Sequence, residues 1–225
     1  MADDLGYGDL GCYGATKIPT PNIDRLAEQG MRFTDAHSSS AVCTPSRYSV
    51  LTGRYCWRTE LKHGVISGYG APLIEKERLT IAKMLKSFGY HTAAIGKWHV
   101  GLGWQVKPGA PTIYDYPRQN LRQNLEVDYN LPLTHGPNDL GFDYFFGIAG
   151  SLDMTPYCYI ENNYSVGIPM GIKSPLYNQQ RPGPVAPGWK DEQVDTTCTQ
   201  KAVDFIKAHA KNQPDQPFFL YMTPA

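Results

Sequence analysis

Residues 80–99 read TIAKMLKSFGYHTAAIGKWH, and this stretch decides the fold. Thr80 can cap a helix over residues 81–88, and Gly89 suits the turn that ends it. The apolar side chains of this helix share one face: Ile81, Met84, Leu85 and Phe88. Residues 90–96 then form an apolar strand that is followed at once by polar side chains. A helix that returns directly into a buried strand is typical of a parallel α/β sheet.

The same alternation of helix and strand occurs on both sides of this stretch. Helices are predicted at residues 21–29 and 191–211, and strands at residues 31–36, 144–146 and 217–222. The sequence therefore predicts an α/β domain with a mostly parallel central sheet that is flanked by helices on both faces. Because the chain opens and closes on such core segments, we expect it to be a piece of a longer domain, truncated at both ends.

The composition of the chain excludes several classes of function. Lys and Arg number 21 and so do Asp and Glu, so the zero net charge gives no basis for binding nucleic acid. The apolar runs are far too short for a membrane span. The five cysteines form no CxxC pair, which argues against a structural zinc site, and a disulfide is not required at this size. Residues 101–193 are rich in Pro and Gly, which is typical of pocket walls or mobile loops.

Two groups of residues near the start of the chain offer chemistry. Asp3 and Asp4 are adjacent carboxylates that either bind a hard cation or form a solvated turn. Pro45 suits the first turn of a helix, which places Cys43 at a helix N-terminus that favours anions. Arg47, one turn further on, could make Cys43 a low-pKa thiolate. The alternative for Cys43 is a small buried side chain without chemistry.

Lys97 and His99 follow the strand at residues 90–96, where ligands bind in open α/β sheets. By themselves they are equally compatible with an exposed turn. The remaining histidines are interpreted as structural or solvated: His37, His63, His91, His135 and His209.

Three short motifs connect these residues to a known family. CTPSR begins at Cys43 and is followed by LTGR, DDLGYGDLG begins at Asp3, and GKWHVGLG begins at Gly96. In this order they resemble the signatures of the sulfatase family, type I and formylglycine-dependent. The resemblance continues through GFDYFFG at residues 141–147 to PFFLY at residues 217–221, and it points to the branch of arylsulfatase A and N-acetylgalactosamine-6-sulfatase.

The resemblance implies an alkaline-phosphatase-like fold, with residues 1–225 as the N-terminal part of the catalytic domain and residues 101–193 as an insertion that forms the pocket wall. It also implies that a formylglycine-generating enzyme or an anaerobic maturase oxidises Cys43 to formylglycine, whose hydrated aldehyde is the nucleophile. Asp3 and Asp4 would bind Ca²⁺ together with residue 43, with Mg²⁺ as the alternative metal. The other implied roles are a clamp on formylglycine (Arg47), a sulfate contact (Lys97), a hydrogen bond to the second hydroxyl (His99) and a wall of the sulfate pocket (Ser151).

The expected function is hydrolysis of an aryl sulfate or a sulfated carbohydrate, in a periplasmic, secreted or lysosomal protein. The family's later metal ligands and its leaving-group acid have no counterpart in these residues, so we expect the 225-residue chain alone to be inactive. Two alternatives stay open. One is a phosphonate monoester or phosphodiester hydrolase that shares these site residues, and the other is a non-catalytic relative that binds sulfated glycans.

Overall fold

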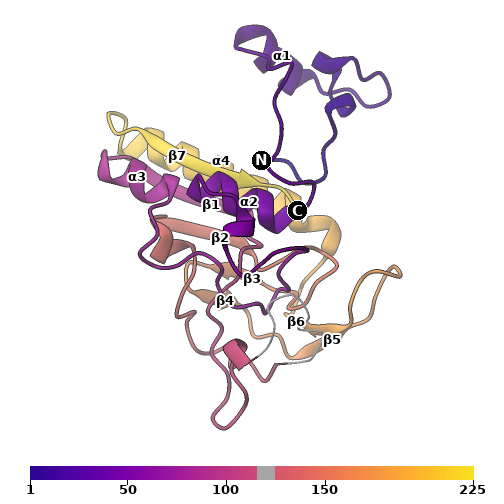
Figure 1. Cartoon of the computed structure of the whole chain (residues 1–225), viewed down its shortest axis with the longest axis vertical. Coiled ribbons are helices and arrows are strands. Elements are labelled where there is room, and N and C mark those ends of the chain that lie inside the picture. The colour runs from indigo at the N-terminus through magenta and orange to yellow at the C-terminus, as the bar shows by residue number, and fades with distance from the viewer. Residues whose placement is uncertain (116–124) are drawn as a thin grey trace.

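The computed structural model of the chain describes residues 1–115 and 125–225. Its centre is a five-stranded sheet in the order β4-β3-β2-β1-β7 (Figure 1). The strands are β1 (His91–Lys97), β2 (Tyr144–Ile148), β3 (Tyr159–Glu161), β4 (Tyr164–Val166) and β7 (Phe218–Thr223). β1 pairs in parallel with β2 and β7, whereas β2–β3 and β3–β4 are antiparallel. The sheet is therefore parallel at its centre and mixed overall, because the short β3–β4 hairpin needs no crossover.

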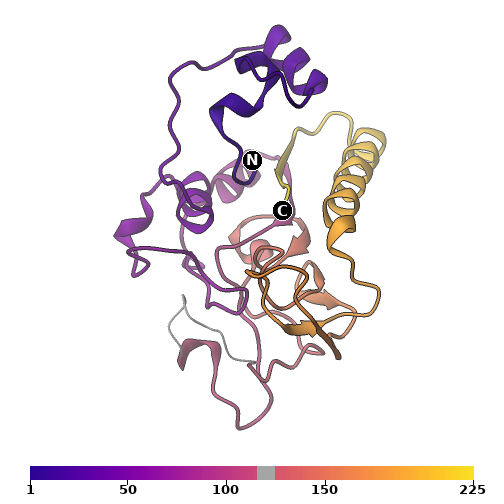
Figure 2. The same ribbon diagram turned by 90° about the vertical axis from the view of Figure 1, so that its right-hand side faces the viewer.

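Helices cover both faces of this sheet, as predicted. Figure 2 shows α4 (Val194–Asn212) on one side of the strands, and α2 (Cys43–Thr52) and α3 (Ile81–Ser87) on the other. Alternate residues of β1, β2, β3 and β7 enter separate cores. In β1, Ala94 belongs to the core with the α2 and α3 side chains, and Ile95 to the core with the α4 side chains.

The helix predicted at residues 81–88 forms, but its buried face differs from the prediction. Thr80 caps α3 by accepting a hydrogen bond from the Lys83 backbone N–H at 3.1 Å. Met84 is 40% exposed and Phe88 is 75% exposed, whereas Ala82 is fully buried. The helix packs against the body through Ala82 and the partly buried Ile81, so two of the four predicted apolar side chains, Met84 and Phe88, face outward.

The strand predicted at residues 31–36 is wrong. This segment has no regular structure, and Met31 and Phe33 are exposed. It follows α1 (Pro21–Gln29), which ends before Gly30 as predicted, and both stand away from the sheet in Figures 1 and 2. An isolated strand leaves its backbone N–H and C=O groups unpaired, and none of the described strands pairs with these residues.

The chain start and the irregular region complete the fold. The Met1 amino group donates a hydrogen bond to the Met222 carbonyl at 2.6 Å, so the first residues lie beside β7 without forming a strand. Residues 101–193 contain β2 to β6, including the two-stranded sheet of β5 (Gly171–Lys173) and β6 (Gly183–Val185). Residues 116–124 of this predicted pocket wall lie outside the described residues. All five cysteines are free. Within the described residues, no helix has the length and apolar character needed to cross a membrane.

Candidate active site

The first turn of α2 presents Cys43 beside the carboxyl end of β1. Val42 precedes the helix in an extended conformation, and Pro45 lies in its first turn, as predicted. The backbone N–H groups of this turn favour a negative charge, because they have no intrahelical acceptor. Burial raises the pKa of the Cys43 thiol above its usual value, although the Lys97 ammonium acts in the opposite direction. The low-pKa thiolate is therefore wrong, because desolvation outweighs the nearby positive charge.

Lys97, the last residue of β1, joins four separate segments of the chain. Its side chain is only 1% exposed. The Lys97 Nζ lies 3.3 Å from the Cys43 Sγ and 3.2 Å from the Ser151 Oγ, and it donates to the Asp3 carboxylate. Thr223, at the end of β7, donates to the Lys97 carbonyl at 2.9 Å. Three residues far apart in the sequence thus converge on the Lys97 ammonium group, and a fourth holds its backbone, at the carboxyl ends of the parallel strands.

Arg47 supplies a second buried positive charge. Its side chain has no exposed surface, and its guanidinium donates to the Asp3 Oδ1 at 3.0 Å and to the Lys97 carbonyl. These bonds direct Arg47 toward Asp3 and β1. Burial alone would raise the pKa of Asp3, but the hydrogen bonds and charges of Lys97 and Arg47 outweigh it and hold this pKa below its usual value. Asp3 therefore remains ionised.

His99, two residues beyond β1, is held in one tautomer. Its Nε2 lies 2.7 Å from the Ile66 carbonyl oxygen, which can only accept, so Nε2 carries the proton. The Nδ1 is buried with a free lone pair and has no hydrogen-bond partner among the described residues. Burial, reinforced by the charges of Lys97 and Arg47, lowers the pKa of His99 to about 3. The imidazole is therefore neutral near pH 7, and its Nδ1 can accept a hydrogen bond or a proton.

Asp3, Asp4 and Cys43 are the group of potential metal ligands that the described residues provide, and their ligand atoms lie within 4.8 Å of one another. The two carboxylates suit a hard divalent cation, whereas a thiol sulfur does not. An oxygen-bearing residue at position 43 would complete a set of hard ligands, so the cluster would fit a hard divalent cation only if Cys43 were converted to such a residue. Since Lys97 and Arg47 already balance the two carboxylates in charge, a divalent cation would make the site net positive and suited to an anion.

The comparison with protein families identifies the family of the chain. The sulfatase family matches the chain over residues 1–225. The chain belongs to the sulfatase family.

Its relatives agree with the predicted branch. The sulfatase chain is 37% identical to the N-acetylgalactosamine-6-O-sulfatase of Bacteroides thetaiotaomicron, over 99% of this chain and 46% of that protein. It is 50% identical to arylsulfatase A of Homo sapiens over 58% of this chain and 24% of that protein. The chain thus spans less than half the length of these curated relatives.

Similarity to a solved structure confirms the alkaline-phosphatase-like α/β fold. A structure from work on glycosaminoglycan metabolism by Bacteroides thetaiotaomicron matches with a TM-score of 0.77 at 36% identity. The match covers 99% of this chain and 49% of that chain. The family and the fold that the sequence motifs predicted are therefore both confirmed.

The structure brings all the predicted site residues of this sulfatase into one region, but it also reveals supports that the sequence analysis missed. Thr44 donates to the His99 carbonyl at 2.8 Å and accepts from the Ile66 backbone N–H at 3.1 Å, which ties the start of α2 to both residues. Thr223 fixes the Lys97 backbone in the same way. The position of Thr44 inside the CTPSR motif was the available signal, whereas nothing local marked Thr223.

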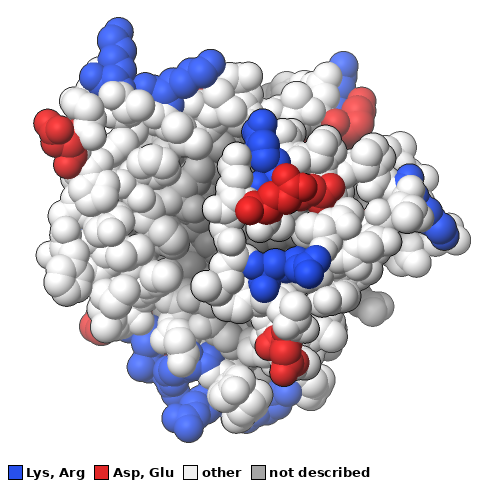
Figure 3. Space-filling view, turned by 90° about the horizontal axis from the view of Figure 1, so that it is seen from above, with Lys and Arg blue, Asp and Glu red and all other residues white. Residues whose placement is uncertain are grey.

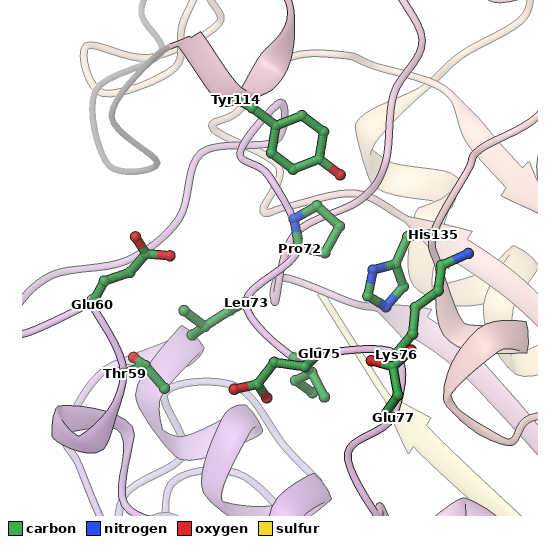
Figure 4. Close-up of a pocket in the computed structure, with 10 residues that line it drawn as sticks. Thr59, Glu60, Pro72, Leu73, Glu75, Lys76, Glu77, Tyr114 and His135 are labelled. Atoms are coloured by element: carbon green, nitrogen blue, oxygen red, sulfur yellow. The ribbon is translucent and has the colours of Figure 1, made fainter.

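One pocket of the molecule is separate from the predicted site residues. A pocket of 470 Å³ lies between residues 59–60 and 72–77, with Tyr114 and His135 on its other side (Figure 4). Its carboxylates belong to three glutamates: Glu60, Glu75 and Glu77. None of the predicted site residues lines it, and its acidic wall disfavours an anionic ligand. On the face seen from the α1 side, acidic and basic side chains are interspersed (Figure 3), whereas Lys97 and Arg47 bring two buried positive charges to the predicted site.

Proposed function

We propose that the protein hydrolyses sulfate esters of carbohydrates, with residue 43 as the nucleophile after oxidation of Cys43 to formylglycine. The observation that carries this proposal is the contact of one buried ammonium, Lys97, with Cys43, Ser151 and Asp3. Membership of the sulfatase family supports the reaction, and the similarity to an N-acetylgalactosamine-6-O-sulfatase over almost the whole chain supports a sulfated sugar as the substrate.

Lys97 and Arg47 stabilise charge in this proposal. A sulfate ester carries one negative charge, and further charge builds on oxygen as the S–O bond breaks. Lys97 is placed to bind a sulfate oxygen, with the Ser151 hydroxyl beside it, and Arg47 orients Asp3. Because both cations are buried and already oriented, they do not have to reorganise during the reaction, which makes their stabilisation of the transition state large.

His99 acts as an acceptor in this proposal. Its bond to the Ile66 carbonyl leaves Nδ1 free, and its pKa of about 3 keeps it neutral. We assign His99 the hydrogen bond to the second hydroxyl of the hydrated residue 43, from which it can take a proton. Formylglycine supplies that pair of hydroxyls, one to attack sulfur and one to release the sulfate. A positively charged imidazole could not accept this proton.

A divalent cation completes the proposed site. Asp3, Asp4 and the modified residue 43 would hold it, and it would supply Lewis acidity that makes a hydroxyl of residue 43 a better nucleophile. We propose Ca²⁺ in preference to Mg²⁺, because calcium accepts irregular sets of oxygen ligands, and Asp4 lies in an exposed loop. A formylglycine-generating enzyme or an anaerobic maturase would be the partner that modifies Cys43.

The proposal is tested on the full-length protein coexpressed with a maturase. Mass spectrometry of the tryptic peptide over residues 33–47 should find formylglycine at position 43, and the same preparation should release sulfate from a sulfated N-acetylhexosamine. Activity of a preparation that contains only cysteine would contradict the nucleophile assignment. Faster turnover of an aryl phosphodiester than of any sulfate ester would favour the phosphodiesterase alternative. Glycan binding without turnover by modified protein would favour a non-catalytic relative.

A further inference from the structure

The loop that carries Ser151 is held by residues about thirty positions further along the chain. The Leu152 carbonyl accepts a hydrogen bond from the Gln180 Nε2 at 2.7 Å. The next carbonyl, that of Asp153, accepts from the Arg181 backbone N–H at 3.0 Å. The segment between β5 and β6 therefore hydrogen-bonds to the two residues that directly follow Ser151.

Gln180 is the buried member of an otherwise exposed segment. It is 3% exposed, whereas residues 174–179 are all exposed. In addition to the Leu152 bond, its Nε2 donates to the Asp191 Oδ2 at 2.8 Å, and its Oε1 accepts from the Leu176 backbone N–H at 2.8 Å. Burial of an amide is unfavourable unless its donors and acceptor are bonded. Here both donors and the acceptor are used, which fixes the orientation of the amide.

Asp191 anchors this amide to the body of the domain. Its carboxylate also accepts from the Lys173 Nζ at 2.7 Å and from the Trp189 Nε1 at 2.6 Å. Burial alone would raise the pKa of Asp191, but the bonds from Lys173, Gln180 and Trp189 outweigh it and hold this pKa below its usual value. Gln180 is therefore bonded to an ionised acceptor that Lys173 and Trp189 also hold in place, shortly before α4.

We propose that Gln180 is a positioning residue for the sulfatase reaction. It holds Leu152 so that the Ser151 Oγ remains 3.2 Å from the Lys97 Nζ, where a sulfate oxygen would bind. This inference rests on the proposed function, because Ser151 matters only if sulfate binds beside Lys97. Gln180 itself contacts neither Lys97 nor Cys43 in the hydrogen bonds of the structure, so its effect passes through the loop.

A double-mutant cycle in the full-length, modified enzyme tests this role. Gln180→Met keeps the size of the side chain and removes all three hydrogen bonds, and we expect kcat/KM for a sulfate ester to fall about tenfold through misplacement of Ser151. If Gln180 acts through Ser151, the same substitution in a Ser151→Ala background should change kcat/KM less than twofold. Equal factors in both backgrounds would overturn the positioning role.

Gln216 offers a matched control. Its side-chain amide also donates to a backbone carbonyl, that of Gly89 at 2.8 Å, but at the other end of β1. Gln216→Met should leave kcat/KM within twofold in both backgrounds. If Ser151→Ala itself leaves kcat/KM unchanged, the proposed sulfate pocket is wrong. If both single variants lower kcat/KM and the loss in the double variant equals the product of the two single losses, only the inference about Gln180 is wrong.

Gln180→Glu provides an independent readout if the methionine variant folds poorly. The carboxylate form cannot donate to the Leu152 carbonyl and repels Asp191, but the protonated form can donate. The ratio of variant to wild-type kcat/KM should therefore rise as the pH is lowered. A ratio that is constant across the acidic range would contradict the role of the Leu152 hydrogen bond.

Discussion

α1 and α2 are helices of nearly equal length, with nine and ten residues, and they have opposite fates in the structure. Both contain proline in the first turn, and both are followed by a glycine. α1 is strongly amphipathic but has no buried residue, whereas α2 lacks a clear apolar face and buries five side chains. Those five are mostly polar: Thr44, Ser46, Arg47, Tyr48 and Leu51.

The difference shows what an amphipathic pattern can and cannot report. It says which face of a helix could be buried, but whether another element covers that face depends on tertiary contacts. Burial of polar side chains such as Arg47 is costly unless each is paired, so it persists where the pairing has a use. In this molecule the polar, unpatterned helix carries the site, and the patterned helix carries none of it.

The largest effect should come from the first residue of α2. Cys43→Ala removes the proposed nucleophile, and kcat should fall by about 10⁴-fold or more, as for other covalent catalysts that lose theirs. Cys12→Ala, next to the α1 region, is the matched control and should retain wild-type kcat. Initial rates of sulfate release measure both, and comparable losses in the two variants would break the contrast between the helices.

Arg47 and Arg25 compare the same side chain on the two helices. Arg47→Lys keeps the charge but loses the planar fork that bonds Asp3 and the Lys97 carbonyl. We expect kcat and kcat/KM to fall together by about 10²–10³-fold, because the lost interaction acts in the transition state. Arg25 is exposed on α1, so Arg25→Lys should have no effect on either constant. A change in KM alone for the Arg47 variant would assign it to substrate binding only.

A substitution of Asp4 tests the proposed metal site, which lies between the start of the chain and the first turn of α2. Asp4→Ala removes one carboxylate from the proposed metal site, and metal content and kcat/KM should fall together, the latter by about 10²-fold. Asp35→Ala, in the exposed segment after α1, should alter neither quantity. Elemental analysis of dialysed protein, paired with kinetics, gives the result, and retention of metal by the Asp4 variant would remove Asp4 from the ligand set.

His99 should give this end of the sheet a pH-dependent stability. Its pKa is about 3 when folded against an ordinary 6.5, so between these values the unfolded chain binds more protons than the folded one. The contribution of His99 is therefore fully present above pH 6.5 and is lost toward pH 3, at about 1.4 kcal/mol per pH unit between the two values.

Urea unfolding from pH 7 to pH 4 measures this slope. His99→Gln should lower the pH dependence of the unfolding free energy, whereas His37→Gln should leave it unchanged, since the His37 side chain is 84% exposed. Parallel curves for wild-type and His99→Gln protein would show that His99 is accessible to protons in the folded state.

The parts of the fold and of the site that the sequence could predict are those that depend on residues close together in the chain or on family motifs. Thr80, Gly89 and the alternation around β1 are local, and they predicted α3 and the central strand correctly. The motif residues Cys43 and Lys97 were predicted because family resemblance preserves long-range proximity. Residues 31–36 were misassigned because a strand is stable only when a neighbouring strand pairs with its backbone, and the local sequence does not show whether such a strand is present. The bond from Gln180 to Leu152 leaves no local trace, since it depends on how a hairpin folds back onto a loop.

The smallest effect should come from the apolar face of α1. Leu26 is 70% exposed and Leu51, on α2, is 1% exposed. In the 225-residue chain, Leu51→Ala should cost about 2–5 kcal/mol of unfolding free energy, because it opens a cavity in a packed core. Leu26→Ala removes little buried surface and should change the unfolding free energy by less than about 0.5 kcal/mol. Urea denaturation of both variants gives the two values. A cost of several kcal/mol for Leu26→Ala would mean that another surface covers α1 in solution. The two helices would then differ in what covers them, and not in whether they are buried.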